Sequence, residues 1–377
     1  MNSINTAESI VELIERLKFE GIPEGDYYIY VNRFLERKAR NKCIPLTGNF
    51  ELTPFCNLDC KMCYVHLDNS QYNRKDLLPP SVWKEMIQQA YNAGMRIATL
   101  TGGECLTYPD FNDVYLCLYS MGIKPGVLSN GILIDEERLD FFKKYPPRMV
   151  QVSLYGSSEE AYERVTGHRC FERVYRNLCL LRDSNIAIKI TITPSLFIED
   201  DIRSFLQFVE NLHIPYNINA NLIPPRSNTG RLTYDLPVDK YVEIFKTRFD
   251  LNSRMLTEID PTELPSENHS SNPHYGLLCG AGRSSFGIKY DGSMCPCLSL
   301  PDINAYPLTS GFVDAWKEIN NQIIKWPMPM ECGDCVYLDR CLPCIAMHGN
   351  APQKGHCDPR ICERTKKLVA AGFISKP

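Results

Sequence analysis

Three cysteines lie within eight residues near the start of the chain, and their spacing is typical of a metal site. Cys56, Cys60 and Cys63 form the pattern C-x3-C-x2-C in the segment ELTPFCNLDCKMCYVHL. Thiolates are soft ligands that suit zinc, copper(I) and iron–sulfur clusters. A structural zinc ion needs four ligands, and His66 is the nearest fourth candidate. A [4Fe–4S] cluster normally takes one cysteine per iron, so three cysteines would leave one iron open to a small molecule.

The composition limits the classes of protein to which the chain can belong. Its 377 residues suffice for a large core and two domains, and 44% apolar with 23% charged residues is typical of soluble proteins. The net charge of −4 predicts no nucleic-acid partner. The sequence has neither a membrane-length apolar run nor a signal-peptide pattern. We therefore expect a cytoplasmic protein with no membrane partner, in which the 17 cysteines bind metal rather than form disulfides.

The pattern along the chain predicts four successive regions. They are a helical leader at 1–45, an alternating α/β region at 46–250, a bridging region at 251–278 and a cysteine-rich region at 279–377. In the leader, apolar residues recur at helical spacing from Ile10 to Leu17, which predicts one amphipathic helix. Packing on the main domain and docking of a peptide are both open to this helix.

The region 46–250 alternates short β-rich runs with helical patterns. The predicted strands are Asn49–Thr53, Arg96–Leu100, Lys124–Ser129, Met149–Leu154, Ala187–Thr193 and Tyr216–Ala220. The predicted helices are Ser81–Ala93, Phe111–Met121, Asp135–Lys144, Phe171–Arg182, Ile202–Leu212 and Val238–Phe249. This alternation predicts a parallel sheet wound into a barrel or partial barrel, with the active site at the carboxyl ends of the strands. The three cysteines follow the first strand and are expected at that edge.

Three further motifs close the second, third and fourth predicted strands, and together with the cysteines they resemble the radical SAM enzymes. The motifs are LTGGEC (Leu100–Cys105), VLSNGILI (Val127–Ile134) and VQVSLYG (Val150–Gly156). In that family the cysteine loop follows the first strand of a partial (β/α)6 TIM-like barrel and holds a [4Fe–4S] cluster. The resemblance implies that S-adenosylmethionine (SAM) binds the open iron and is cleaved to a 5'-deoxyadenosyl radical.

The resemblance also implies which residues contact SAM. They are, in chain order, Tyr64, Gly102, Gly103, Glu104, Ser129, Asn130, Ser153 and Arg164. Tyr64 is expected near the adenine, and the two glycines allow close approach of the backbone. Glu104 is expected to accept a hydrogen bond from the SAM ammonium group. Ser129 and Asn130 match ribose-contacting positions. Ser153 with Arg164 resembles the pair that holds the carboxylate, and Arg169 and Arg173 are rivals to Arg164.

Two residues depart from the family pattern. Cys105 stands where family members usually have proline. It is either a tolerated loop substitution or a catalytic thiol that donates a hydrogen atom near SAM. Tyr155 stands where many relatives have aspartate.

The cysteine spacing beyond residue 279 resembles the SPASM domain of peptide-modifying radical SAM enzymes, which holds two auxiliary [4Fe–4S] clusters. This resemblance assigns Cys279, Cys295, Cys297 and Cys344 to the first cluster and Cys332, Cys335, Cys341 and Cys362 to the second. Cys357 is the alternative to Cys295. Two residues separate Cys341 from Cys344, whereas the usual pattern has three at this point. By spacing alone, Cys332, Cys335, Cys341 and Cys344 also fit a zinc ribbon.

The SPASM resemblance implies a peptide substrate, and we expect a ribosomally made precursor peptide (RiPP maturation). A radical would abstract hydrogen from a carbon of this peptide, and a cysteine sulfur would capture that carbon as a thioether. A reductase such as flavodoxin or ferredoxin would supply electrons. Carbon–carbon or carbon–oxygen cross-linking and epimerisation are alternatives. An anaerobic sulfatase-maturing enzyme is another, although Leu298 stands where those enzymes carry an acidic base. A non-catalytic zinc-binding interaction protein is the alternative from another class.

Overall fold

The computed structural model describes residues 9–24, 27–65, 77–219, 222–223, 226, 234–251, 279–300, 302–341, 344, 346 and 355–374. His66, His348 and most of the predicted bridging region lie outside the described residues. Within them, the helices are too short or too polar to cross a bilayer. None of the 17 cysteines forms a disulfide bond in the structure that these residues define.

One sheet of eight strands forms the centre of the fold. Its strands are β1 (Thr47–Glu51), β2 (Ile97–Thr101), β3 (Gly126–Ser129), β4 (Met149–Leu154), β5 (Ile188–Ile192), β6 (Tyr216–Ile218), β7 (Ser285–Ile288) and β8 (Met294–Cys295). Their order in the sheet is β6-β5-β4-β3-β2-β1-β7-β8. Neighbours pair in parallel from β6 to β7, and only the β7–β8 pair in this sheet is antiparallel.

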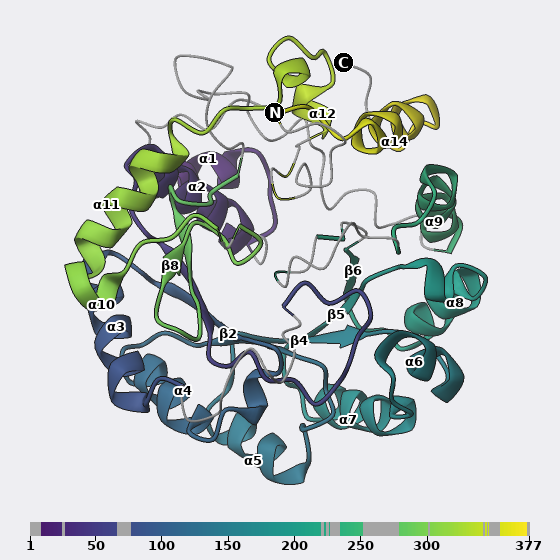
Figure 1. The fold of residues 1–377 in the computed structure, drawn as a ribbon, viewed down its shortest axis with the longest axis horizontal. Coiled ribbons are helices and arrows are strands. Elements are labelled where there is room, and N and C mark those ends of the chain that lie inside the picture. The colour runs from purple at the N-terminus through teal and green to yellow at the C-terminus, as the bar shows by residue number, and fades with distance from the viewer. Residues whose placement is uncertain are drawn as a thin grey trace.

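Helices lie along the outer side of this sheet, as Figure 1 shows. They are α3 (Pro80–Ala93), α4 (Phe111–Ser120), α5 (Glu136–Lys144), α6 (Glu159–Thr166), α7 (Phe171–Asp183), α8 (Ile202–Asn211) and α9 (Val238–Leu251). Their apolar faces and the strands form one core that includes Phe50, Trp83 and Phe205, all fully buried. A parallel sheet requires such covering helices because each strand-to-strand crossover passes outside the sheet.

The structure confirms the six predicted strands with ends within two residues of those expected. The prediction missed α6 because this helix is short and follows β4 after a brief loop. It also missed β7 and β8. Strand β7 pairs in parallel with β1 (Phe50 opposite Ile288), although it lies beyond the predicted boundary at residue 279. The first part of the cysteine-rich region therefore shares a sheet with the region 46–250. The closure of this sheet as a partial barrel stays a prediction.

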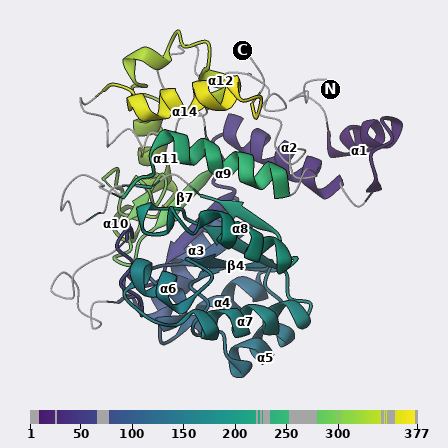
Figure 2. The same cartoon turned by 90° about the vertical axis from the view of Figure 1, so that its right-hand side faces the viewer.

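The leader contains two helices, not the one predicted. Helix α1 (Ile10–Phe19) begins at a capping box, in which Ser9 and Glu12 exchange hydrogen bonds. It packs against α2 (Tyr27–Asn41) through Leu13, Leu17 and Phe34, which form a small separate core. In Figure 2 this pair projects from the side of the molecule.

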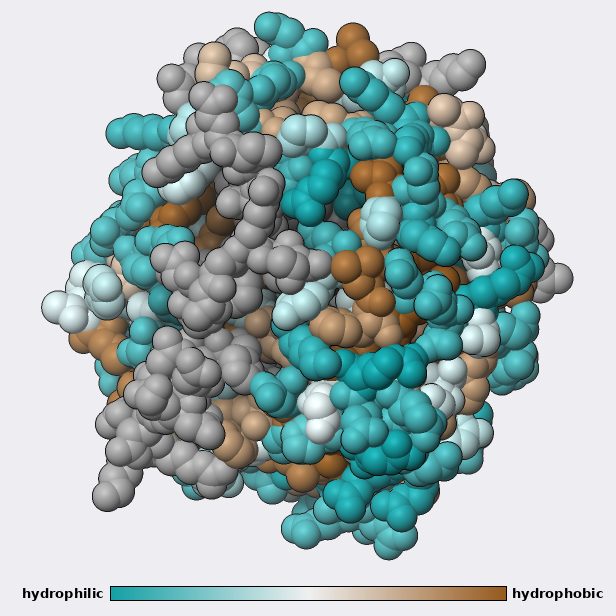
Figure 3. Space-filling view, turned by 45° about the vertical axis from the view of Figure 1, so that its right-hand side comes forward, coloured by the Kyte–Doolittle hydropathy of each residue, from teal (hydrophilic) through white to brown (hydrophobic). Residues whose placement is uncertain are grey.

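The C-terminal residues pack on the end of the α/β region. After α10 (Pro307–Ser310) and α11 (Phe312–Ile323), the chain continues through α12 (Leu338–Cys341) to α14 (Pro359–Ala370). Helix α14 lies against α9, where Lys367 pairs with Asp239 at 2.6 Å. Arg360, near its start, pairs with Asp235 at 2.8 Å. On the face drawn in Figure 3, hydrophilic side chains predominate and apolar ones gather between them.

Candidate functional site

The loop that carries the three cysteines continues directly from β1 and is fixed on two sides. On one side, Gly103 N–H donates to the carbonyl of Thr53 (2.8 Å) and Glu104 N–H to that of Phe55 (2.9 Å). On the other, the N–H groups of Asp59 and Lys61 donate to carbonyls in the last turn of α6 (3.0 and 3.1 Å). These main-chain bonds hold the loop across the carboxyl ends of the strands, as predicted.

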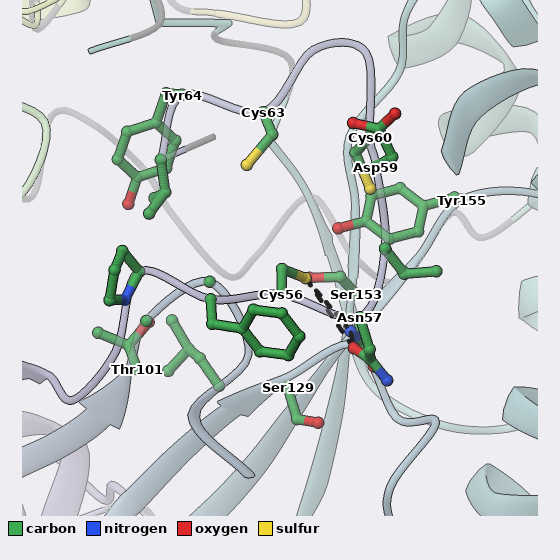
Figure 4. A pocket seen from close by; sticks show the side chains of 18 of the residues that line it. Cys56, Asn57, Asp59, Cys60, Cys63, Tyr64, Thr101, Ser129, Ser153 and Tyr155 are labelled. Carbon is green, nitrogen blue, oxygen red and sulfur yellow. Dashed lines mark hydrogen bonds between the residues drawn. The ribbon is translucent and has the colours of Figure 1, made fainter. Parts of the chain in front are cut away.

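The cysteines of this loop line a cavity of about 630 Å³. Figure 4 shows Cys56, Cys60 and Cys63 around one space, with Tyr64, Ser129, Ser153 and Tyr155 on its walls. Burial, with smaller contributions from the nearby carboxylate of Glu104 and thiol of Cys63, raises the pKa of Cys56 to about 12. Burial and the two other thiols raise the pKa of Cys60 well above its usual range. Bound metal would relieve this crowding of potential anions, since it takes up thiolates and releases their protons.

The two glycines of LTGGEC let the cysteine loop approach the end of β2. A Cβ on Gly102 would lie 2.4 Å from the carbonyl oxygen of Thr53, and one on Gly103 would lie 2.5 Å from those of Pro54 and Phe55. Only glycine leaves room for this contact. Both glycines also line the cavity. The close approach seen here is therefore to the chain's own loop, whereas the sequence suggested approach to a ligand.

Glu104 is buried and holds the ends of two strands together. Its carboxylate accepts from the Asn130 N–H (2.6 Å), the Ser129 hydroxyl (3.1 Å) and the Leu106 N–H (3.1 Å). Burial raises its pKa, which these three donors partly counteract. The carboxylate that we expected to accept from the SAM ammonium group thus already accepts from these three donors and from the Cys105 thiol at 3.9 Å.

Asn130 and Tyr155 bring polar groups to the cysteines. The Asn130 amide donates to the Asn57 side chain (2.7 Å) and approaches the sulfur of Cys56 (3.7 Å). The Tyr155 phenol lies beside Cys60 and lowers the pKa of its thiol, and Figure 4 shows the hydroxyl pointing into the space between the three thiols. Its pKa is well raised by burial and by those thiols, so the phenol keeps its proton. The sequence showed Tyr155 only as a departure from the family pattern.

Besides Glu104, which lies behind the wall, two predicted residues of this site lie apart from the cavity lining. Cys105 is fully buried, and its thiol donates to the carbonyl of Leu128 at 3.1 Å. Of the two alternatives for Cys105, this position favours the tolerated loop substitution over the hydrogen-atom donor, because the thiol is buried between Leu128 and Glu104. Arg164, on α6, pairs instead with Asp201 and donates to the carbonyl of Phe197. Ser153, its expected partner, does line the cavity.

Sequence reasoning missed a buried ion pair beside the cysteine loop. Arg226 donates to Glu51, at the end of β1, over 2.7 Å, with side chains 9% and 1% exposed. Its guanidinium also lies 5.5 Å from the ring centroid of Tyr64 and donates to the carbonyl of Leu298 at 2.9 Å. A charged residue in the middle of a predicted β-strand, Glu51, was the available signal. Its partner lies 175 residues away and has no local signature.

The cysteines beyond residue 279 fall into two groups. The first group lies around β7 and β8 and consists of Cys279, Cys295 and Cys297. Burial and the thiol of Cys297 raise the pKa of both Cys279 and Cys295. Around α12 and α14, the sulfurs of Cys357 and Cys362 lie 3.1 Å apart, and Cys332 contacts Cys357. Cys341 lies close to this second group, Cys335 is a turn beyond Cys332, and Cys344 is exposed. Cys295 thus lies with the first group and Cys357 with the second.

Comparison with known proteins adds a family. Residues 50–210 match the sequence model of the Radical SAM superfamily. The antilisterial bacteriocin subtilosin biosynthesis protein AlbA of Bacillus subtilis is 25% identical over 292 residues, or 74% of this chain. The match spans 60% of the length of AlbA. Mycofactocin maturase MftC of Mycobacterium tuberculosis is 24% identical over 359 residues, or 88% of each chain.

Solved structures support the fold. The structure of native anSMEcpe with bound AdoMet has a TM-score of 0.70 at 19% identity, and the match covers 87% of this chain and 97% of that one. A second structure of anSMEcpe, with AdoMet and the Kp18Cys peptide, gives a TM-score of 0.69 at 18% identity.

Proposed function

Residues 50–210 belong to the radical SAM superfamily, and on this premise we propose that the chain cleaves SAM and modifies a peptide. The observation that carries the proposal is the set of three half-buried thiols that line one cavity at the carboxyl ends of the strands. Such a group of soft ligands fits a [4Fe–4S] cluster with one open iron. When bound, this cluster supplies the electron that breaks a carbon–sulfur bond of SAM.

The chain's own residues would orient SAM and keep water from the site. Gly102, Gly103, Ser129 and Asn130 form the wall that faces the cysteines, and the carboxylate of Glu104 fixes Ser129 and Asn130 from behind. Glu104 would therefore act on SAM through these two neighbours. Tyr64 provides an aromatic face on the opposite wall, where adenine would lie. Ser153 would face the SAM carboxylate, and we assign it no partner there in place of Arg164.

The substrate that we propose is a ribosomally made precursor peptide. AlbA and MftC support this choice, since one is named for bacteriocin biosynthesis and the other as a mycofactocin maturase. The anSMEcpe structure with a bound peptide shows that a protein of this fold accepts one in the presence of AdoMet. A thioether between a cysteine sulfur and a carbon of the peptide is the product that we propose. Its formation releases two hydrogens, one to the deoxyadenosyl radical and one as a proton, together with one electron.

Two auxiliary clusters would receive that electron. The two groups of cysteines support this number, with Cys279, Cys295, Cys297 and Cys344 as ligands of the first cluster. Cys332, Cys335, Cys341 and Cys362 would hold the second, in a SPASM domain. The contact of Cys357 with Cys332 and Cys362 makes it a rival ligand there. A reductase such as flavodoxin or ferredoxin would reduce the first-strand cluster.

The test is to reconstitute the protein anaerobically with iron and sulfide, add SAM, dithionite and a cysteine-containing precursor peptide, and measure 5'-deoxyadenosine and peptide mass. We expect deoxyadenosine from the wild type and from Cys117→Ala, a control cysteine on α4, but none from Cys60→Ala. A peptide that loses two hydrogens per cross-link, with the bond at a cysteine sulfur, supports the thioether. A peptide with a carbon–carbon or carbon–oxygen bond would instead support those alternatives to the thioether. Zinc bound in place of iron would refute the proposal that the chain is an enzyme.

A further inference from the structure

Arg226 forms a hydrogen bond to the residue after one cysteine in each of two separate sites. Its own N–H donates to the carbonyl of Tyr64 at 3.0 Å, and Tyr64 follows Cys63. Its guanidinium donates to the carbonyl of Leu298 at 2.9 Å, and Leu298 follows Cys297. One residue therefore connects the loop of the first-strand cysteines to the segment that carries the first auxiliary cysteines.

The charge of Arg226 is buried and has a defined partner. Burial lowers the pKa of the guanidinium, but the carboxylate of Glu51 at 2.7 Å raises it by more, so the net direction is upward. An arginine in this position stays charged at every pH at which the protein is folded. The strand that carries Glu51 pairs with β2 on one side and β7 on the other. The ion pair is thus held at the end of an interior strand of the sheet.

Arg226 also lies close to the cysteines themselves. Its guanidinium lies within electrostatic range of Cys295 and 5.5 Å from the ring centroid of Tyr64, and Tyr64 is within electrostatic range of both Cys63 and Cys297. Thiolate-bound clusters carry net negative charge, and a fixed cation beside one favours its reduced form. The hydrogen bonds and the positive charge of Arg226 therefore both act on the segment that carries Cys295 and Cys297.

Resting on the proposed function, we propose that Arg226 is a positioning residue. It fixes the Cys295–Cys297 segment against the first-strand cysteine loop and thereby sets the ligand geometry and reduction potential of the first auxiliary cluster. Glu51 holds the guanidinium in place. The role differs from that of a cysteine ligand, because Arg226 acts through the carbonyls of Tyr64 and Leu298.

The decisive variant is the double substitution Arg226→Met with Glu51→Gln. It removes both charges together, because a single substitution would leave an unpaired buried charge and unfold the chain. Arg226→Lys keeps the charge but cannot reach Glu51 and Leu298 together. Arg148→Met is the control for loss of an arginine, since Arg148 lies just before the amino end of β4, at the opposite end of the strands from the cysteines. Each protein is reconstituted in full length, and circular dichroism first confirms its fold.

The readouts are bound iron, the redox titration of each cluster followed by electron paramagnetic resonance, and the ratio of modified peptide to deoxyadenosine. We expect the double variant to cleave SAM within about threefold of wild type, because the first-strand cysteines stay in place. We also expect a first auxiliary cluster that is lost or titrates at a more negative potential, and a product ratio about tenfold lower. Arg226→Lys should lie between, and Arg148→Met should match the wild type.

A double variant that keeps the wild-type iron content, potentials and product ratio would overturn the inference. So would a wild-type protein that takes up only the first-strand cluster. Failure of the proposed function is seen separately, as a wild type that makes no deoxyadenosine. In that case the iron content and potentials of the auxiliary cluster still decide whether Arg226 positions it.

Discussion

The substitution Gly103→Ala would test how the cysteine loop is held. The added Cβ would lie 2.5 Å from the carbonyl oxygens of Pro54 and Phe55, and an ordinary contact begins at 3.4 Å. The loop would have to move by about 0.9 Å, the difference between these distances. The atoms in its way belong to the backbone, so no side-chain rotation relieves the clash.

The cost follows from the bonds that this movement breaks. The hydrogen bond from Glu104 N–H to the Phe55 carbonyl is 2.9 Å long and would not survive such a shift. Overpacking costs about 1–3 kcal/mol and a lost hydrogen bond about 1 kcal/mol, so we expect about 3 kcal/mol in the free energy of unfolding. For a chain of 377 residues that unfolds as one unit, this lowers the melting temperature by about 4 °C. Displaced thiols should also bind about four fewer irons per chain.

The assay is thermal unfolding of the metal-free protein, together with iron analysis after reconstitution. Gly122→Ala is the control, because Gly122 has a positive φ of 78° but open space around its Cα. It should cost only about 1 kcal/mol of backbone strain and leave iron uptake unchanged. The reasoning is refuted if Gly103→Ala binds iron like the wild type and melts no lower than Gly122→Ala.

Three further predictions concern single side chains. Tyr155→Phe should keep its iron but lower the cluster potential by about 40 mV, since the hydroxyl beside Cys60 favours the thiolate and its loss removes about 1 kcal/mol of that stabilisation. Redox titration checks this, and an equal shift in Tyr162→Phe would contradict it. Cys105→Ala should keep deoxyadenosine and product formation within about twofold, because the buried thiol faces the Leu128 carbonyl; loss of product with intact SAM cleavage would show that this thiol does chemistry. In the metal-free protein, burial raises the pKa of Cys56 to about 12 by disfavouring the thiolate. Iodoacetamide at pH 8 should therefore alkylate Cys56 about 1,000-fold more slowly in the folded protein than in the unfolded chain, and the rate should rise up to pH 12. Mass spectrometry of samples taken over time measures this rate. A Cys56 that reacts as fast as in the unfolded chain would contradict the prediction.

Local patterns determined much of this protein. The alternation of β-rich runs and helical patterns was enough to predict six parallel strands, because hydrophobic periodicity and turn residues are properties of short segments. The spacing of Cys56, Cys60 and Cys63 indicated a soft-metal site for the same reason. Their position after β1 then placed them at the carboxyl edge, since that edge is shared by all strands of a parallel sheet.

Only the tertiary structure decided which groups meet at that edge. In the folded chain, Glu104 contacts Ser129 and Asn130, Tyr155 lies beside Cys60, and Cys105 is buried in the core. The tertiary structure also added β7 to the sheet beside β1, which brings the later cysteines next to the first loop.

The pair of Glu51 with Arg226 shows the physical reason. Its two residues are 175 positions apart, and nothing in either local sequence encodes the other. Burial, pairing and pKa depend on distances between segments, and those distances exist only once the sheet has formed.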